Sequence, residues 1–467
     1  MNSEMQRKRT RFGSILLGTG LLFILPALSA PVAAQDAGES PNIVIVFTDD
    51  MGYGDLGTYG HPTIRTPALD GMAEEGMKFT QFYVPSPVCT PSRAALLTGR
   101  LPVRSGVNGV LWPYSDRGLP PGEVTMASAL KTRAYATAHI GKWHLGDHSP
   151  HLPTDHGFDY YYGIPYSNDM NREQWGLIHT PLMRNEEIIE QPVDQRTLTR
   201  RYTDESLRFI RKNKNRPFFL YLAHTFPHTP LFASEEFEGR SSRGLYGDVV
   251  EEIDSGMKQI LDELKAHGLE ENTLVIFTSD NGPWLLRGQD GGSAGLLSGG
   301  KHTTWEGGTR VPAIARWPGT IGEGQVSQAL ASTMDLYTTV IKLAGAELPG
   351  DRIIDGVDLM PVLTGREDQV RDIIHYYGNG ELRALRKGPW KVHFRTTKLI
   401  PDGTSEVHDP PLLYNIETDP SEQYNVGGEH PDIIMDLVRE ADNHSEDLIR
   451  GEEQTTQVKE KFKYLFE

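Results

Sequence analysis

The most constraining feature of this sequence is a repeated succession of an amphipathic helical segment and a short apolar run. The first apolar run, "PNIVIVFTDD" at 41–50, is rich in β-branched residues and ends in two carboxylates. Runs of this kind are typical of strands that are buried on both faces of a parallel sheet. Helices alternating with such strands predict an α/β fold, with a large, mostly parallel central sheet flanked by helices on both faces. The helix-then-strand pattern recurs at 66–84, 125–146, 202–228 and 249–282.

Polar and charged residues follow directly where several of these apolar runs end. In an open α/β sheet, ligands collect at the carboxyl ends of the strands, so these residues are candidates for one shared site. The acidic and amide side chains among them are hard oxygen ligands that suit Ca²⁺ or Mg²⁺. The alternative is that D-D and D-N-G are ordinary turn sequences. The oxygen ligands are Asp49, Asp50, Asp280 and Asn281, and the same strand ends supply Lys142, His144 and His228.

The charge balance limits what such a site can bind. The chain has 63 acidic and 46 basic residues and a formal net charge of −17, so binding of nucleic acid through a general positive field is excluded. An anion must instead be held by local cations. Arg93, Lys142 and Lys301, together with a divalent metal, describe a site for a multiply charged oxyanion.

The first residues of the chain read as a targeting segment. "MQRKRTRFG" is basic, "SILLGTGLLFILPALSA" is apolar, and "PVAAQ" offers small residues at a cleavage point. This layout predicts a signal peptide at 1–34, hence a periplasmic or secreted protein without a stable membrane anchor. The alternative is an uncleaved N-terminal anchor, but the apolar run is short and interrupted by Gly and Pro.

The sequence pattern changes near residue 370. "ELRALRKGPWKVHFRTT" places a Lys-Gly-Pro turn between two short segments, which indicates a hairpin. A further strand and a closing helix follow. We therefore expect a catalytic domain at 35–369 and a smaller C-terminal α+β subdomain at 370–467, with a short antiparallel sheet.

Cys89 is the only cysteine of the chain and lies in "PSPVCTPSRAALLTGR" at 85–100. A lone thiol in an oxidising compartment is a liability unless it is buried or consumed by chemistry. From the residue alone, Cys89 is either a buried small side chain, a thiol nucleophile, or the precursor of another group.

Four ordered motifs resemble those of the type I sulfatases. "CTPSRAALLTGR" (89–100) is similar to the family signature C-x-P-S-R-x-x-x-L-T-G-R at every fixed position, and the other three follow in the family's order. "GIPYSNDM" (163–170) and "PPLLYNIETDPSEQYNV" (410–426) look most like the branch of arylsulfatase A and N-acetylgalactosamine-6-sulfatase. The other motifs are "GKWHLG" (141–146), "SDNG" (279–282) and "GGKHTTWEGGTRVP" (299–312).

This resemblance implies an alkaline-phosphatase-like fold and hydrolysis of sulfate esters. It implies that a formylglycine-generating maturation enzyme oxidises Cys89 to Cα-formylglycine, whose hydrate attacks sulfur. It also implies one Ca²⁺, although the ligand types equally permit Mg²⁺. The implied metal ligands are Asp49, Asp50, Asp280, Asn281 and residue 89.

The same resemblance implies a role for each polar residue around the nucleophile. Arg93 and Lys142 would stabilise the hydrated aldehyde, with Ser167 hydrogen-bonding nearby. His228 and Lys301 would contact the sulfate and the leaving oxygen, and His144 would take a proton when sulfate is expelled. The alternative for both histidines is a buried side chain bonded to backbone. His302, next to Lys301, receives no role.

Two rival functions stay open beside this one. The first is a phosphatase or phosphodiesterase of the same superfamily, which would use a serine or threonine and two zinc ions. The second is a catalytically silent glycan-binding protein, which would predict damage to the nucleophile or the metal set.

The substrate expected from the resemblance is a sulfated carbohydrate, with aryl sulfates also cleaved. Residues that could contact a sugar from the loops are Trp112, Trp175, Tyr376 and Arg383, although loop aromatics can equally pack only against their own loop.

Overall fold

A computed structural model describes residues 40–170, 179–400 and 403–455. The predicted signal peptide at 1–34, Trp175, and the last residues of the C-terminal region lie outside the described residues. Within the described part of the chain, none of the helices combines the length and the apolar character that crossing a bilayer requires.

The central sheet has eleven strands in the described residues, in the order β10-β2-β9-β8-β1-β7-β3-β4-β5-β6, with β11 also paired to β2. Strands β8, β1, β7, β3 and β4 run parallel, whereas β9, β5 and β6 introduce antiparallel pairs. The sheet is thus mixed with a parallel centre, as predicted. Its strands are β1 (Asn42–Thr48), β2 (Met77–Tyr83), β3 (Ala136–Gly141), β4 (Tyr160–Gly163), β5 (Leu182–Arg184), β6 (Glu187–Glu190), β7 (Phe218–Ala223), β8 (Thr273–Ser279), β9 (Arg310–Arg316), β10 (Gln325–Ser327) and β11 (Ala331–Ser332).

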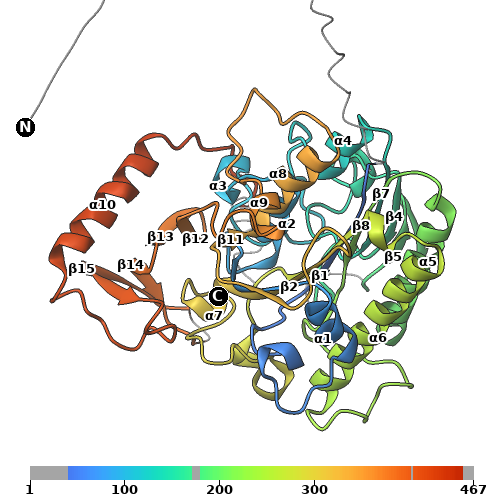
Figure 1. The fold of residues 1–467 in the computed structure, drawn as a ribbon, viewed down its shortest axis with the longest axis horizontal. Coiled ribbons are helices and arrows are strands. Elements are labelled where there is room, and N and C mark those ends of the chain that lie inside the picture. The colour runs from blue at the N-terminus through green and yellow to red at the C-terminus, as the bar shows by residue number, and fades with distance from the viewer. Residues whose placement is uncertain (1–39, 171–178, 401–402, 456–467) are drawn as a thin grey trace, which may run out of the picture. The chain divides into compact units, whose positions relative to one another are not determined.

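Helices cover both faces of this sheet (Figure 1). Successive side chains of a strand point to opposite faces, so β1 divides its residues between two cores. Ile43 and Phe47 pack with one set of helices, whereas Val44 and Val46 pack with the other. The first set is α2 (Cys89–Thr98), α4 (Met126–Lys131) and α8 (Thr333–Leu343); the second is α1 (Pro67–Glu74), α5 (Leu198–Asn213) and α6 (Leu245–Ala266).

The remaining helical elements of the central part are short. They are α3 (Pro102–Ser105), α7 (Glu306–Thr309), α9 (Met360–Leu363) and the 3₁₀ turns η1 (Gly57–Tyr59), η2 (Pro153–His156), η4 (Gln195–Thr197), η5 (Glu270–Asn272) and η6 (Leu285–Asp290).

The parallel pairing brings the carboxyl ends of the central strands to one edge. Backbone hydrogen bonds continue there beyond the strands: the amide of Asp49 donates to Phe226 at 3.2 Å, and that of Asp280 donates to Thr48 at 3.0 Å. The amide of Lys142 donates to Ala223 at 2.8 Å. The residues singled out from the sequence therefore emerge next to one another because of the register of β1, β3, β7 and β8.

The C-terminal region has its own antiparallel sheet, in the order β12-β13-β14-β15, as predicted. The Lys-Gly-Pro turn joins β13 to β14, where Gly388 has φ 55°. The helix α10 (Pro431–Glu446) covers the sheet through Ile434 and Leu437 (Figure 1). The strands are β12 (Ile373–Gly378), β13 (Glu381–Lys387), β14 (Trp390–Thr397) and β15 (Ser405–Asn415).

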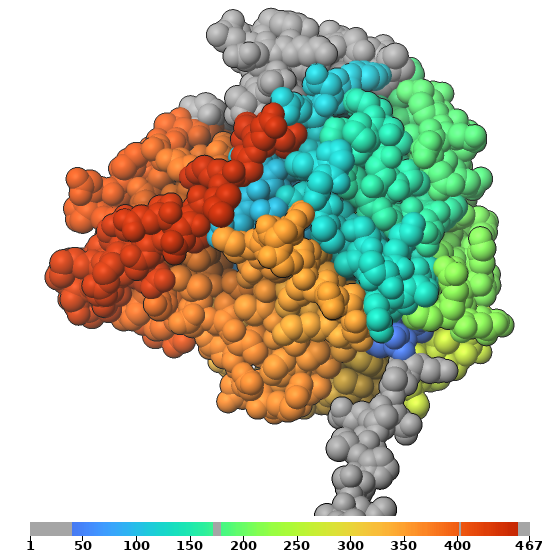
Figure 2. Space-filling model, turned by 90° about the horizontal axis from the view of Figure 1, so that it is seen from above, coloured from blue at the N-terminus to red at the C-terminus, as the bar shows by residue number. Residues whose placement is uncertain are grey.

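The last described residues return to the region of the first domain. The amide of Gly451 donates to Val103 at 3.0 Å, and that of Gln454 donates to Gly106 at 2.8 Å. Figure 2 shows this red segment lying against the light-blue residues near α3. The division at 369/370 stays a prediction, since the segment after α10 packs on both parts.

Candidate active site

Cys89 is the first residue of helix α2, where an extended segment turns into the helix. Val88 before it has φ −145° and ψ 152°. Cys89 is only 2% exposed, and burial raises the pKa of its thiol. Amide groups in the first turn of a helix carry partial positive charge, so this position favours an anion next to residue 89.

Arg93 lies one helical turn further along α2 and is completely buried. Its Nε and Nη2 donate to Oδ2 of Asp280 at 3.1 and 2.8 Å, and its Nη1 donates to the carbonyl oxygen of Lys142 at 2.9 Å. Its Nη2 also lies 3.7 Å from Oδ2 of Asp49. The guanidinium group therefore ties the helix that carries Cys89 to the ends of three central strands.

Lys142 follows β3, and its Nζ donates to Asp49 and, at 3.1 Å, to Oγ of Ser167. Burial opposes ionisation of Asp49, but the charge of Lys142, helped by the charges of Arg93 and Lys301, overcomes it and holds the pKa of Asp49 well below its ordinary value. Asp49 is therefore an anion at neutral pH, in contact with the cation that the sequence motif placed beside it.

Asp50 brings Lys301 and Asn281 into the same cluster. Nζ of Lys301 lies 2.7 and 2.8 Å from the two carboxylate oxygens of Asp50, and Nδ2 of Asn281 donates to Oδ1 at 2.7 Å. The backbone amide of Asp50 donates to Oδ1 of Asp280 at 3.1 Å. Asp50 has φ 66°, a conformation that costs a non-glycine residue energy and is concentrated at functional sites.

Two buried oxygen atoms of this cluster have no hydrogen-bond partner among the described residues: Oδ1 of Asp49 and Oδ1 of Asn281. Buried polar atoms are normally paired, so two unpaired oxygens among carboxylates fit an electropositive ligand. The donor set of carboxylate and amide oxygens suits Ca²⁺ or Mg²⁺. Ligand atoms lie within 4.8 Å of one another in two groups, Asp49 with Asp50 and His228, and Asp49 with Cys89 and Asp280.

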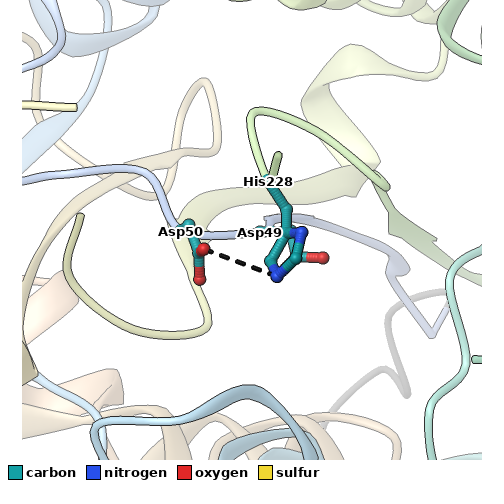
Figure 3. Close-up of side chains that lie close together, drawn as sticks. All are labelled: Asp49, Asp50 and His228. Atoms are coloured by element: carbon teal, nitrogen blue, oxygen red, sulfur yellow. Dashed lines mark ion pairs between the residues drawn. The ribbon is translucent and has the colours of Figure 1, made fainter. Parts of the chain in front are cut away.

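His228 faces the same cluster from the segment after β7. Its Nδ1 lies 2.6 Å from the carbonyl oxygen of Thr229 and 3.2 Å from Oδ1 of Asn168. Two oxygen acceptors at Nδ1 require the proton there, which leaves Nε2 as an acceptor in the neutral ring. Nε2 is 3.7 Å from Oδ2 of Asp50 (Figure 3). Burial, and then the charge of Lys301, lowers the pKa of His228 to about 3.

His144 has the complementary arrangement. Its Nε2 donates to the carbonyl oxygen of Leu111 at 3.0 Å, whereas its Nδ1 is buried and meets no hydrogen-bond partner in the described part of the chain. Burial, and then the charge of Lys142, holds its pKa well below the ordinary value, so the ring is neutral and Nδ1 is an acceptor. Like Asp50, His144 has a positive φ, at 62°.

The arrangement matches one group of proteins. Residues 41–346 match the sulfatase family model, and residues 369–465 match the model of the C-terminal region of aryl-sulfatase. The chain belongs to the sulfatase family. Its relatives are sulfuric ester hydrolases, so this sulfatase is an enzyme that hydrolyses sulfate esters.

Sequence and structural relatives agree over nearly the whole chain. Human arylsulfatase A is 43% identical over 455 residues, covering 89% of each chain. Mouse N-acetylgalactosamine-6-sulfatase is 40% identical, covering 93% of this chain and 91% of the relative. The crystal structure of the PsFucS1 sulfatase from Pseudoalteromonas sp. superposes with a TM-score of 0.81 at 31% identity, covering 87% and 90%. The branch expected from the motifs and the expected fold are both confirmed.

The catalytic and metal-binding residues expected from the sequence lie in this cluster or face it. Sequence analysis missed two further residues there. Asn168 holds His228, and its Nδ2 donates to Oε1 of Gln195 at 3.0 Å. Trp284 lies with its ring centroid 4.7 Å from Nζ of Lys301 and 5.4 Å from the ring of His228. Asn168 stands next to Ser167 in one of the motifs, and Trp284 follows "SDNG" closely, so proximity to motifs was the available signal.

The residues of this sulfatase that were expected to contact a sugar lie in different environments. Tyr376 is completely buried, and its hydroxyl donates to Oε1 of Glu306 at 3.0 Å, so its expected role at the rim is wrong. The reason is the alternation along β12, which turns Tyr376 towards the first domain. Arg383 lines a cavity close to Cys89, and Trp112 is half-buried.

Proposed function

We propose that this protein is an exported sulfatase that hydrolyses sulfate esters of carbohydrates, and also small aryl sulfates, with a nucleophile derived from Cys89. The observation that carries the proposal is the position of Cys89, at the N-terminus of α2 and within one buried cluster of three carboxylates and three cations. A thiol with a raised pKa is a poor nucleophile, so the unmodified cysteine is poorly suited to attack sulfur, and a nucleophile derived from it by a maturation enzyme is favoured over the thiol itself.

The residues that would hold a divalent cation are Asp49, Asp50, Asp280, Asn281 and residue 89. Ca²⁺ is the expected ion, and the same oxygen donors also accept Mg²⁺. When bound, the cation supplies charge that neutralises the sulfate oxygens during the displacement. Lys142 and Lys301, which contact Asp49 and Asp50 directly, keep these carboxylates oriented for it.

The cations around residue 89 have a direct role in the chemistry. The hydrate of formylglycine 89 would supply two hydroxyls, one for attack on sulfur and one whose deprotonation would expel sulfate. Arg93 and Lys142 stabilise negative charge near the attacking oxygen, and Ser167 orients Lys142 through the 3.1 Å hydrogen bond. Lys301 and His228 approach from the side of Asp50, where they contact the sulfate and the leaving oxygen.

The two histidines take different parts in the proton transfers. His144 is a neutral ring whose buried Nδ1 has no hydrogen-bond partner in the described part of the chain, so this nitrogen can accept a proton from the second hydroxyl. His228 presents Nε2 towards the leaving oxygen, but this nitrogen carries no proton in the neutral ring. The proton for the departing alcohol therefore comes from Lys301, and Nε2 accepts a hydrogen bond from the alcohol so formed. Its Nδ1–H is fixed by Asn168 and by the carbonyl of Thr229, so the ring keeps one tautomer.

A carbohydrate substrate is supported by the name of one relative, N-acetylgalactosamine-6-sulfatase, and by a polar cavity beside Cys89. The N-terminal sequence supports export and cleavage after residue 34. The two matched regions, 41–346 and 369–465, support a catalytic domain at 35–369 and a C-terminal subdomain at 370–467.

The decisive experiment is the mass of the tryptic peptide 79–93 from protein made in its own host, together with turnover of 4-nitrophenyl sulfate. We expect Cys89 to have lost sulfur and gained an aldehyde oxygen, and sulfate to be released. An intact thiol in a preparation that nevertheless turns over would overturn the formylglycine nucleophile. Turnover of phosphate esters in place of sulfate esters would favour the phosphatase alternative.

A further inference from the structure

A cavity of about 490 Å³ adjoins the cluster at Cys89 and is built from both parts of the chain. Val88 and His302, the neighbours of Cys89 and Lys301 in the sequence, form its inner wall, and Trp284 lies between the cavity and His228. The C-terminal sheet forms the outer wall. The volume lies within the range of about 300–1,000 Å³ that is usual for small-molecule sites.

The lining of this cavity contrasts with the charge of the chain. The protein has 17 more acidic than basic residues, yet the described residues that line the cavity include Arg383 and Lys398 and no aspartate or glutamate. Thr397 and Ser405 add polar groups to the same wall. A pocket that avoids acidic residues in an acidic protein is suited to an anionic ligand.

Arg383 is a largely buried cation of this cavity whose guanidinium group is only partly paired. Its side chain is 11% exposed, and its Nη1 donates to Oγ1 of Thr397. Its Nε is buried without a hydrogen bond to any described residue, 3.7 Å from a carboxylate oxygen of Glu381. Glu381 is itself engaged at 3.0 Å by Arg395, so it only partly neutralises Arg383.

The backbone is shaped to admit the Arg383 side chain. A Cβ atom at Gly378 would lie 2.7 Å from Nε of Arg383, so a larger residue at that position would displace the Arg383 side chain. Burial, together with the charge of Arg395, lowers the pKa of Arg383, the behaviour of a cation that lacks full compensation. Both observations describe an arginine held in place with donor capacity left over.

We propose that Arg383 determines substrate specificity by binding a second anionic group, a carboxylate or a second sulfate ester, on the sugar whose sulfate ester is cleaved at residue 89. This inference rests on the proposed function and adds the class of carbohydrate. A guanidinium group recognises either oxyanion with two parallel hydrogen bonds.

The test compares substrates that differ only in the second charge. The first pair is a sulfated disaccharide with a uronic acid and the same disaccharide with the carboxylate reduced to an alcohol. The second pair is a disulfated and a monosulfated sugar, and 4-nitrophenyl sulfate serves as the reference. We expect kcat/KM to be about tenfold to hundredfold higher for the doubly anionic member of at least one pair.

Arg383→Ala should abolish this preference and leave turnover of 4-nitrophenyl sulfate within about twofold of wild type. Arg383→Lys should retain part of the preference, because lysine keeps the positive charge but cannot form the two parallel hydrogen bonds of a guanidinium group. Lys387→Ala is the matched control, since Lys387 is another cation of β13, binds Glu440 at 2.6 Å and is not among the described residues that line the cavity, so it should change turnover of neither substrate class.

The outcomes separate this inference from the proposed function. Equal kcat/KM within both pairs for the wild-type enzyme overturns the inference without requiring any variant to fold. Equal losses on all substrates in Arg383→Ala overturn it as well. A wild-type enzyme that releases no sulfate from 4-nitrophenyl sulfate, although residue 89 is converted, contradicts the proposed function instead.

Discussion

Two clusters of buried charges occur close together in this protein, and they are built differently. The first is the site at Cys89, with Asp49, Asp50 and Asp280 against Arg93, Lys142 and Lys301. The second, the Glu306 cluster, joins α7 to the C-terminal sheet. Its members are Glu306, Glu422, Arg310, Arg386, Lys391 and His393.

The clusters differ in how completely their oxygens are paired. In the Glu306 cluster, Oε1 of Glu306 accepts from Tyr376 and Lys391, and Oε2 accepts from Tyr83 at 2.6 Å. Both carboxylate oxygens of Glu422 are also engaged. In the site at Cys89, two oxygens have no partner among the described residues, and burial together with Asp49 raises the pKa of Asp280.

The difference indicates two purposes for the same residue types. A cluster whose carboxylate oxygens are all paired stabilises one packing of the chain, whereas a cluster with unpaired oxygens and crowded carboxylates is completed only by a ligand. Changes at the site should therefore reduce turnover and spare folding, and changes in the Glu306 cluster should do the reverse.

The largest effect is expected for Cys89→Ala. Loss of the nucleophile should lower kcat by about 10⁴-fold or more. The free energy of unfolding should change by less than about 1 kcal/mol, because the buried side chain is small and alanine occupies nearly the same volume. Turnover of 4-nitrophenyl sulfate and thermal unfolding measure the two quantities. Residual activity above a few per cent would refute the assignment of residue 89.

Removal of divalent metal is expected to have the next largest effect. Chelation should lower kcat by about 10²–10³-fold. Added Ca²⁺ should restore kcat, because the carboxylates of Asp49 and Asp50 can then bind a cation again. The melting temperature should fall only slightly. Asp50→Asn should show the same loss of turnover, without recovery in Ca²⁺. Full activity after exhaustive chelation contradicts a metal in this site.

Glu306→Gln tests the other cluster. Breaking a buried ion pair on one side should lower the free energy of unfolding by about 3 kcal/mol at neutral pH, while folded enzyme keeps near-normal kcat. Burial opposes ionisation of Glu306, but Lys391, Arg386 and Arg310 overcome it and hold its pKa well below the ordinary value. The stabilisation is therefore complete above the ordinary pKa of glutamate and is lost as the pH falls towards the folded-state value.

Denaturant unfolding of wild type and Glu306→Gln across this pH range measures that dependence. The difference between the two proteins should shrink as the pH falls below about 4.3. Lys387→Ala, whose partner Glu440 is a half-exposed residue of helix α10, is the control and should cost less than about 1 kcal/mol at any pH. A difference that grows in acid would contradict the role of Glu306 as the ionised partner of its cluster.

The fold and the first cluster could be predicted from the sequence because they depend on local patterns. The apolar runs with polar ends marked the strand edges, and short motifs marked Cys89, Arg93 and Lys142. The parallel pairing then needed only the register of buried strands to bring those residues together.

The Glu306 cluster and the positions of the expected sugar-contacting residues could not be predicted, because both depend on how the C-terminal sheet packs against the rest of the chain. Glu306 lies inside one of the sequence motifs, but its partners Lys391 and Arg386 come from β14 and β13. Alternation along β12 turned Tyr376 inward, against the expectation of a sugar contact. Long-range packing of this kind leaves no trace in local sequence.

The smallest predicted effect separates positioning from folding inside the site. Asn168→Ala removes the side-chain acceptor at Nδ1 of His228, leaves the carbonyl oxygen of Thr229 as the other acceptor, and should lower kcat about tenfold, with KM nearly unchanged. Asn168→Asp keeps an acceptor and adds a negative charge, so the pKa of His228 should rise and the acidic limb of the rate profile should move to higher pH. Gln195→Ala removes the anchor of Asn168 on its other side and should have a smaller effect. A residue that only supported the fold would lower activity in both Asn168 variants without moving the pH profile, so the shift decides whether Asn168 acts through His228.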